Sequence, residues 1–306
     1  MGLGLKKHGR ARRYGEAIVA LSIRKGLLRM NELTSLPYVI FMGDFNSGKS
    51  LLINALLRRN TLDASREESR ALPTFINRED HTEASFAALS RDTGLELQSH
   101  EQFLNLRHDE ADHAGYVARA AQVPRVPFSR LAFIDTAGMS SDVLGPMAIR
   151  SLADQENALL VVVTDIEYWA ARHNMAFIAE HHAMFGRNLV VVANKADHLN
   201  ADEVVRIRDK AALRMEDYGI APAPRFFALS ARLEMTRSGP PDEYRMRTKQ
   251  PVRDLCDAGF DQLRVALYEF EAAHATLPPV PLEQMVSTPL AKSFVDALTP
   301  QEGAVL

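Results

Sequence analysis

The chain alternates short apolar runs with longer stretches in which apolar residues recur at helical spacing. The run Tyr38–Met42 has the length and composition of a buried parallel strand. Similar runs predict strands at 130–134, 158–163, 189–193 and 225–229, with weaker ones near 85–89 and 95–98. Helical spacing predicts helices at 11–30, 51–59, 145–156, 171–185, 201–217 and 255–274. The segments 60–82 and 237–252 are polar, and we predict irregular loops there.

This alternation predicts an α/β fold with a doubly wound, mainly parallel sheet and flanking N- and C-terminal helices. We place one such domain at residues 35–275. A basic helical arm precedes it at 1–34, and a proline-containing tail, predicted to be extended, follows at 276–306. In sheets of this kind ligands bind beyond the carboxyl ends of the strands. The chemistry is therefore expected in the loops that follow the strands.

Charge is spread unevenly along the chain. The net charge is −3, but the first 30 residues hold eight Lys or Arg and one acid, Glu16, so they carry +7 and the remainder −10. A basic arm on an acidic body can contact an acidic membrane surface, a partner protein or, less favoured here, a nucleic acid. The alternative is a solvated helix end. With no apolar stretch of about 20 residues and a single cysteine, Cys256, we predict a cytoplasmic protein with optional peripheral membrane contact.

The segment Gly43–Ser50 (GDFNSGKS) follows a predicted strand, opens a predicted helix and matches the phosphate-binding pattern G-x-x-x-x-G-K-[ST]. Its glycines let backbone N–H groups approach phosphate oxygens. The Lys49 cation suits the β- and γ-phosphates, and the Ser50 hydroxyl is a hard ligand for Mg²⁺. The residues expected to contact a nucleotide here are Gly43, Asn46, Ser47, Gly48, Lys49, Ser50 and Leu51.

Asp135-Thr136-Ala137-Gly138 ends the predicted strand 130–134. A carboxylate at this place can hold Mg²⁺, so Asp135 is a predicted metal ligand, and Gly138 lets a backbone N–H approach the γ-phosphate. Such sites also need a threonine that caps the γ-phosphate and completes the Mg²⁺ shell. The candidates between the two motifs are Thr61, Thr74, Thr82 and Thr93.

Asn194-Lys195-Ala196-Asp197 ends the predicted strand 189–193. The Asp197 carboxylate can accept hydrogen bonds from N1–H and the 2-amino group of guanine, two donors that adenine lacks. Lys195 can cover the base and brace the phosphate loop. Ser230-Ala231 follows the last predicted strand, where the Ala231 N–H is expected to face guanine O6.

Taken in order, these elements resemble the G1 to G5 set of the translation-factor-related class of P-loop GTPases. The run Met42–Leu57 (MGDFNSGKSLLINALL) resembles the P-loop and first helix of bacterial dynamin-like proteins, and Pro73-Thr74 is similar to their switch I. The long gap from Thr74 to Asp135 also resembles dynamins. The resemblance implies hydrolysis of GTP to GDP and phosphate with Mg²⁺. It selects Thr74 as the catalytic and metal-binding threonine, an incidental loop threonine being the alternative.

Asn46 stands where potassium-activated GTPases, which this loop resembles, supply a side-chain oxygen to K⁺, and where dynamins hold Na⁺ or K⁺ with a serine. Met139 stands where Ras-like proteins carry a water-orienting glutamine. The resemblance thus implies cation-assisted hydrolysis in a nucleotide-dependent homodimer formed by the G domain, acting on a membrane or a protein partner. Alternatively, Asn46 only stabilises the turn. An Era-like regulatory or assembly-factor switch that binds RNA or protein is the competing function.

Overall fold

The computed structural model describes residues 37–64, 72–79, 82–90, 93–106, 115–136, 157–237 and 242–274. Several predictions fall on other parts of the chain. They are the basic arm at 1–34, the helix at 145–156, the tail at 276–306, and the roles of Gly138 and Met139. These lie outside the described residues and stay predictions.

Within the described residues the strands form one nine-stranded sheet with the order β4-β3-β5-β2-β6-β1-β7-β8-β9. Its strands are β1 (Tyr38–Gly43), β2 (Thr74–Glu79), β3 (Ser85–Ser90), β4 (Gly94–Gln98), β5 (Tyr116–Pro124), β6 (Ala132–Asp135), β7 (Ala158–Asp165), β8 (Leu189–Asn194) and β9 (Arg225–Ala228). Strands β6, β1, β7, β8 and β9 run parallel, whereas β2 is antiparallel to β6, and β3 is antiparallel to both β4 and β5. The predicted α/β, mainly parallel architecture is confirmed.

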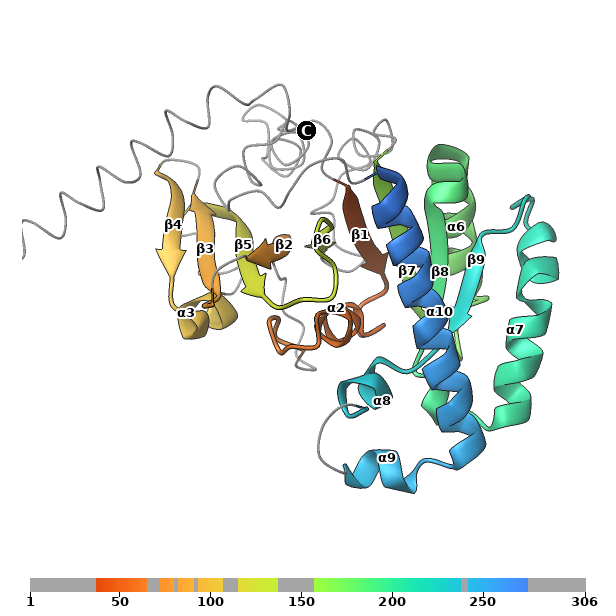
Figure 1. The fold of residues 1–306 in the computed structure, drawn as a ribbon. Helices are drawn as coiled ribbons and strands as arrows, with labels where there is room; N and C mark the ends of the chain where they lie inside the picture. Colours follow the sequence, from red (N-terminus) through yellow and green to blue (C-terminus); the bar gives the residue numbers. More distant parts are fainter. Residues whose placement is uncertain are drawn as a thin grey trace, which may run out of the picture.

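Helices cover both faces of the sheet (Figure 1). They are α2 (Lys49–Leu57), α3 (His100–Asn105), α6 (Arg172–Phe185), α7 (Ala201–Glu216), α8 (Ala231–Met235), α9 (Glu243–Arg247) and α10 (Gln250–His274), with short 3₁₀ turns at Gly186–Asn188 and Ala196–His198. Figure 1 shows α10 crossing one face of β7 and β8, with α6 behind them on the other. None of the helices in the described ranges is long and apolar enough to cross a bilayer.

The central strand β1 shows how the apolar pattern builds two cores. Tyr38, Ile40 and Met42 are buried in the cluster that includes α6 and α7 side chains. Val39 and Phe41 are buried in the opposite cluster, with side chains of α2 and of the C-terminal half of α10. Successive residues of a strand point to opposite faces, so an uninterrupted apolar run is what a strand covered on both sides requires.

Two strands depart from the prediction. The segment 60–82 was expected to be irregular, which is wrong for β2: its six residues pair with β5 on one side, and the first three of them pair with β6 on the other. Strand β5 was not predicted, and alanines at 118, 120 and 121 explain why, since alanine has little strand preference. Both strands owe their state to partners far away in the sequence.

The predicted polar loop at 237–252 is also partly wrong, because α9 and the first turn of α10 lie in it. Asp242 starts α9 by accepting a hydrogen bond from the Tyr244 N–H through Oδ1, at 2.6 Å. Arg245 then binds Asp257 of α10. The polar composition of this segment indicated a loop. The Asp242 cap and the ion pair between α9 and α10 stabilise helix there instead.

Helix α10 lies unusually close to β9 at Gly259. A Cβ at this position would stand 2.0 Å from the Ala228 carbonyl oxygen, which is backbone and cannot rotate away. Only a glycine permits this approach. The contact matters for the site because β9 leads directly into Ser230 and Ala231.

Candidate functional site

The phosphate-binding loop connects β1 to α2 at the carboxyl edge of the sheet. Gly43 has a φ of +153°, and a Cβ there would collide with the Val163 carbonyl oxygen at 1.8 Å. Gly48 has a φ of +88°, in the left-handed region, and a Cβ there would stand 2.4 Å from Asn194 Nδ2. The loop is therefore wedged between β7 and the residue that ends β8. Both predicted glycines have a steric reason to be glycine.

Lys49 turns back onto its own loop. Its Nζ donates to the carbonyl oxygens of Gly43, at 3.0 Å, and Asp44, at 2.9 Å. Burial lowers the pKa of Lys49, while the Asp135 and Asp44 carboxylates act in the opposite direction. A buried ammonium whose partners among the described residues are two backbone carbonyls is well placed to exchange them for phosphate oxygens.

Ser50 and Asp135, predicted as metal ligands, are brought together. Ser50 Oγ donates to Asp135 Oδ2 at 2.8 Å. The other oxygen, Asp135 Oδ1, is buried and makes no hydrogen bond within the described residues, and the same is true of Ser47 Oγ in the phosphate loop. Burial raises the pKa of Asp135, against the opposing effects of Ser50, Lys49 and Arg119. Unsatisfied buried polar atoms require an explanation, and a bound Mg²⁺ with nucleotide phosphates supplies one.

This donor set fits Mg²⁺ in a nucleotide site. A hydroxyl and a carboxylate are hard oxygen ligands, and Mg²⁺ is usually held by one or two such groups together with substrate phosphates and water. In the described ranges no group of three or more His, Cys, Asp or Glu side chains could hold a metal ion by itself. The residues thus suit a metal whose shell is completed by phosphates.

Thr74 lies beside these ligands but is engaged elsewhere. It pairs directly with Asp135 across β2 and β6, so the two residues share one face of the sheet. The buried Thr74 hydroxyl donates to the Leu72 carbonyl at 3.1 Å and accepts from Arg119 Nε at 3.0 Å. Arg119 is itself buried and stacks over Phe103. The predicted capping of a γ-phosphate requires Thr74 to leave these partners.

Asn194 joins three loops through one buried amide. Its Nδ2 donates to the Ser47 carbonyl in the phosphate loop at 2.8 Å, and its Oδ1 accepts from the Ala231 N–H at 3.0 Å. The brace on the phosphate loop that was predicted for Lys195 is thus made by Asn194. The Ala231 N–H, predicted to face guanine O6, donates to Asn194 Oδ1 here. To bind O6 it must either donate to both oxygens or exchange Asn194 Oδ1 for O6. Ser230 Oγ accepts from the Leu233 N–H and caps α8.

The predicted guanine-binding side chains have partners that sequence reasoning missed. Lys195 Nζ forms an ion pair with Asp165 Oδ2, at 2.8 Å, from the end of β7. Asp197 accepts a hydrogen bond from the Tyr244 hydroxyl of α9. Asp165 carried a usable signal, because it follows an apolar strand at the edge where ligands bind. Tyr244 carried none, since it lies in the segment predicted to be a loop.

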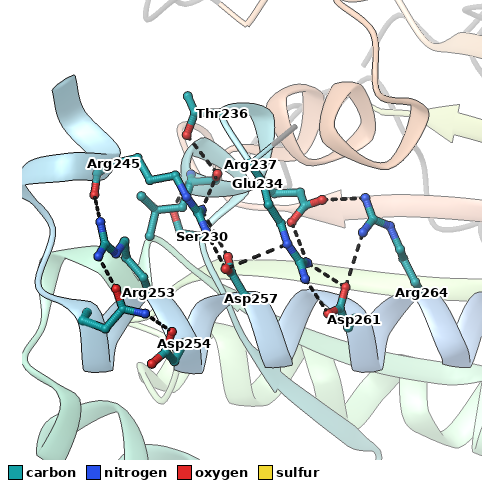
Figure 2. A network of polar contacts seen from close by, with 12 residues as sticks. Ser230, Glu234, Thr236, Arg237, Arg245, Arg253, Asp254, Asp257, Asp261 and Arg264 are labelled. Carbon is teal, nitrogen blue, oxygen red and sulfur yellow. Dashed lines mark hydrogen bonds and ion pairs between the residues drawn. The ribbon is translucent and has the colours of Figure 1, made fainter. Parts of the chain in front are cut away.

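A polar network fixes α8 to α10 directly behind the site (Figure 2). Arg264 Nη2 of α10 donates to Glu234 Oε1 of α8 at 2.6 Å, and both side chains are buried. Arg237 binds Asp261 through both terminal nitrogens, at 2.7 and 2.8 Å. Bidentate pairs are directional as well as strong. Because α8 begins at Ala231, the network holds the Ser230-Ala231 loop in place from the rear.

Comparisons with known proteins agree with this geometry. The profile of the Dynamin family matches residues 39–196, which is more than half of the chain. No curated protein matches the sequence significantly. Two structures of an oligomerised bacterial dynamin pair, described as providing a mechanism for long-range sensing and tethering of membranes, share the fold.

The first dynamin structure is 15% identical in sequence and has a TM-score of 0.55; the match covers 92% of this chain and 50% of the dynamin chain. The second is 14% identical and has a TM-score of 0.53; the match covers 84% of this chain and 50% of the dynamin chain. This chain therefore spans about half the length of either relative. A structure of Era with MgGDPNP and nucleotides 1506–1542 of 16S ribosomal RNA is 16% identical in sequence. The match covers 76% of this chain and 56% of the Era chain. Its TM-score is 0.41.

Proposed function

Because the chain belongs to the dynamin family and carries the GTPase domain of that family, we propose that it hydrolyses GTP to GDP and phosphate in a dimer of two such domains. The observation that carries this proposal is a pair of buried oxygens, Asp135 Oδ1 and Ser47 Oγ, which have no hydrogen-bond partner in the described ranges and lie beside Lys49 and Ser50. All four groups lie at one edge of the sheet. A cation, two hydroxyls and a carboxylate are the groups that bind a nucleoside triphosphate together with Mg²⁺.

Each residue has a defined task in this reaction. Lys49 exchanges its carbonyl partners for the β- and γ-phosphates and offsets their charge. Ser50 and Asp135 would hold Mg²⁺, and Thr74, which pairs with Asp135 across β2 and β6, would be the third ligand. When bound, Mg²⁺ neutralises charge that develops on the phosphates. Backbone N–H groups of the phosphate loop orient the triphosphate, and Gly138 contributes one at the γ-phosphate.

Guanine selection is assigned to Asp197, which accepts two donors that adenine lacks. Lys195 covers the base with its aliphatic part once its ion pair with Asp165 opens or turns. Asn194 keeps the base loop and the phosphate loop at a fixed separation through its bonds to Ser47 and Ala231. Base and phosphates are therefore read by one connected unit.

Asn46 is the proposed ligand of a monovalent cation. It has a φ of 60°, and it is exposed. Its amide makes no hydrogen bond within the described part of the chain, so the amide oxygen is open to a ligand. A neutral oxygen suits K⁺ or Na⁺ because it does not cancel the positive charge that the transition state needs. A second domain packed across the nucleotide would complete the cation site and exclude water.

The wider role is proposed by analogy. The bacterial dynamins that share this fold are described as an oligomerised pair that senses and tethers membranes. The +7 arm at residues 1–30 of this chain suits attraction to an acidic membrane surface, because each basic residue near such a surface contributes about 1 kcal/mol. We propose that nucleotide-dependent pairing acts at such a surface or on an acidic partner protein.

The test measures phosphate release against protein concentration in K⁺, Na⁺ and Cs⁺. The variant Asn46→Gly is sharper than an alanine change, because it removes the side-chain amide while glycine still adopts the left-handed backbone without strain. Asn60→Ala, at an exposed position past α2, is the matched control. We expect turnover that rises with protein concentration, depends on the cation, and loses the cation dependence in Asn46→Gly. Turnover independent of both variables would overturn the mechanism.

Base selection is tested separately with Asp197→Asn. We expect weaker GTP binding and new binding of xanthosine triphosphate, whose 2-oxo group can accept from the introduced amide. Equal affinity of the unmutated protein for ATP and GTP would contradict the assignment.

A further inference from the structure

The carboxylate assigned to guanine is already covered by a side chain of the protein. Tyr244 of α9 donates its hydroxyl hydrogen to Asp197 Oδ2. The Asp197 side chain is only 2% exposed. Guanine offers N–H donors to the same carboxylate, so Tyr244 presents the same kind of group that the base would present. The protein thus supplies its own ligand to its base-reading residue.

Contacts with α8 and α10 hold Tyr244 and its neighbour Arg245 in position. Arg232, the residue after Ala231, places its guanidinium 3.5 Å from the centre of the Tyr244 ring. Arg245 Nη1 donates to the Leu233 carbonyl of α8 at 2.9 Å, and its guanidinium pairs with Asp257 of α10. Figure 2 shows Arg245 and Asp257 within the same network that fixes α8 to α10. The tyrosine is therefore an anchored part of the fold.

The chemistry of Tyr244 makes it a donor throughout the physiological pH range. Burial, and then the bond to Asp197, raise the pKa of the Tyr244 hydroxyl to about 12. Because the Asp197 side chain is only 2% exposed, the bonded Tyr244 hydroxyl occupies the place beside Asp197 Oδ2 that a guanine N–H would take.

We propose that Tyr244 is a gate of the guanine site: it occupies Asp197 before nucleotide binds and must swing away, with α9 shifting or its side chain turning, to admit the base. This inference rests on the proposed function, namely that Asp197 reads guanine. Apparent affinity then equals the intrinsic affinity reduced by the fraction of molecules whose gate is open. The gate also links base binding to the α8–α10 network, because α9 is anchored there.

The experiment measures calorimetric affinity of GDP and of inosine diphosphate, which lacks the 2-amino group, for the full chain. Tyr244→Phe removes only the hydroxyl. Tyr218→Phe is the matched control. Tyr218 lies just past the end of α7 and, like Tyr244, has an arginine over its ring: the Arg214 guanidinium lies 5.1 Å from the ring centre. Asp257→Asn, which loosens the anchor of α9 without touching Asp197, is a second test variant.

We expect Tyr244→Phe to tighten GDP binding roughly tenfold, the size of one hydrogen bond to a charged group. Inosine diphosphate should gain by the same factor, since the cost of opening is common to both bases. Asp257→Asn should shift both affinities in the same direction, and Tyr218→Phe should leave them unchanged.

Weaker GDP binding with an altered ratio of the two affinities would overturn the gate, because Tyr244 would then position Asp197 for guanine. Unchanged affinities in both test variants would overturn it as well. Failure of the proposed function has a different signature: the unmutated protein would bind GDP no better than ADP, or would bind neither.

Discussion

Replacing Gly259 by alanine sets two known effects against each other. In an exposed helix interior, glycine to alanine stabilises by about 1 kcal/mol, because alanine has the higher helix propensity. At Gly259 the new methyl would stand 2.0 Å from the Ala228 carbonyl oxygen. To reach an ordinary non-bonded distance, helix and strand must separate by about 1 Å or more. Neither atom can escape by changing a rotamer, because both belong to the backbone frame.

Overpacking of this kind costs about 1–3 kcal/mol. Separation also thins the contact that buries Val252, Cys256 and Phe260 of α10. We therefore expect Gly259→Ala to lower the free energy of unfolding, by up to about 2 kcal/mol after the propensity gain is included. Since β9 continues into Ser230 and Ala231, GDP affinity should fall too.

The neighbouring residue gives an internal control. Ala258 is exposed on the same turn of α10, so Ala258→Gly should cost about 1 kcal/mol through propensity alone and leave GDP affinity unchanged. Denaturant unfolding followed by circular dichroism measures both variants, and amide hydrogen exchange locates the loss in β9 and α10. A Gly259→Ala protein more stable than the unmutated one would refute the reasoning, because propensity would then outweigh the backbone contact.

Two further changes test the site. Asn194→Ala leaves the Ser47 carbonyl and the Ala231 N–H without their buried partner, so denaturant unfolding should show a loss of about 2 kcal/mol or more; lost GDP affinity at unchanged stability would argue against a structural brace. Lys49→Ala should weaken GTP binding in calorimetry by about 2–5 kcal/mol, while the nucleotide-free protein keeps its thermal stability because burial opposes the charge. Near-normal GTP binding by this variant would contradict the assignment of the phosphate loop.

Local pattern was sufficient where one segment determines its own state. The apolar runs that became β1, β7 and β8 are long enough to be buried on both faces. The phosphate loop was readable because its glycines, lysine and serine act within eight consecutive residues. The meeting of Ser50 with Asp135 followed from the rule that ligands bind at the carboxyl ends of strands.

Pairings between distant segments were not readable in this way. Strand β2 exists because β5 and β6 flank it, and nothing in Thr74–Glu79 alone announces that. Arg119 reaches Thr74 from a strand that the alanine-rich sequence concealed. Tyr244 reaches Asp197 only because an ion pair and a cap fold α9 under α8. In each case the deciding energy comes from a contact that periodicity does not encode.

The position of β1 in the sheet has a consequence for how the protein is made. Its two neighbours are β6 and β7, so Tyr38 finds its partners at Ala132 and Ala158. During synthesis roughly 120 residues must follow β1 before both edges are paired, which at cellular elongation rates takes on the order of ten seconds. Helix α2 follows at once and can shield Val39 and Phe41, but both strand edges stay open until β6 is made, and one edge stays open until β7 follows. An apolar strand with unpaired edges is prone to wrong contacts, so this interval of synthesis is when the nascent chain is most exposed to aggregation through β1.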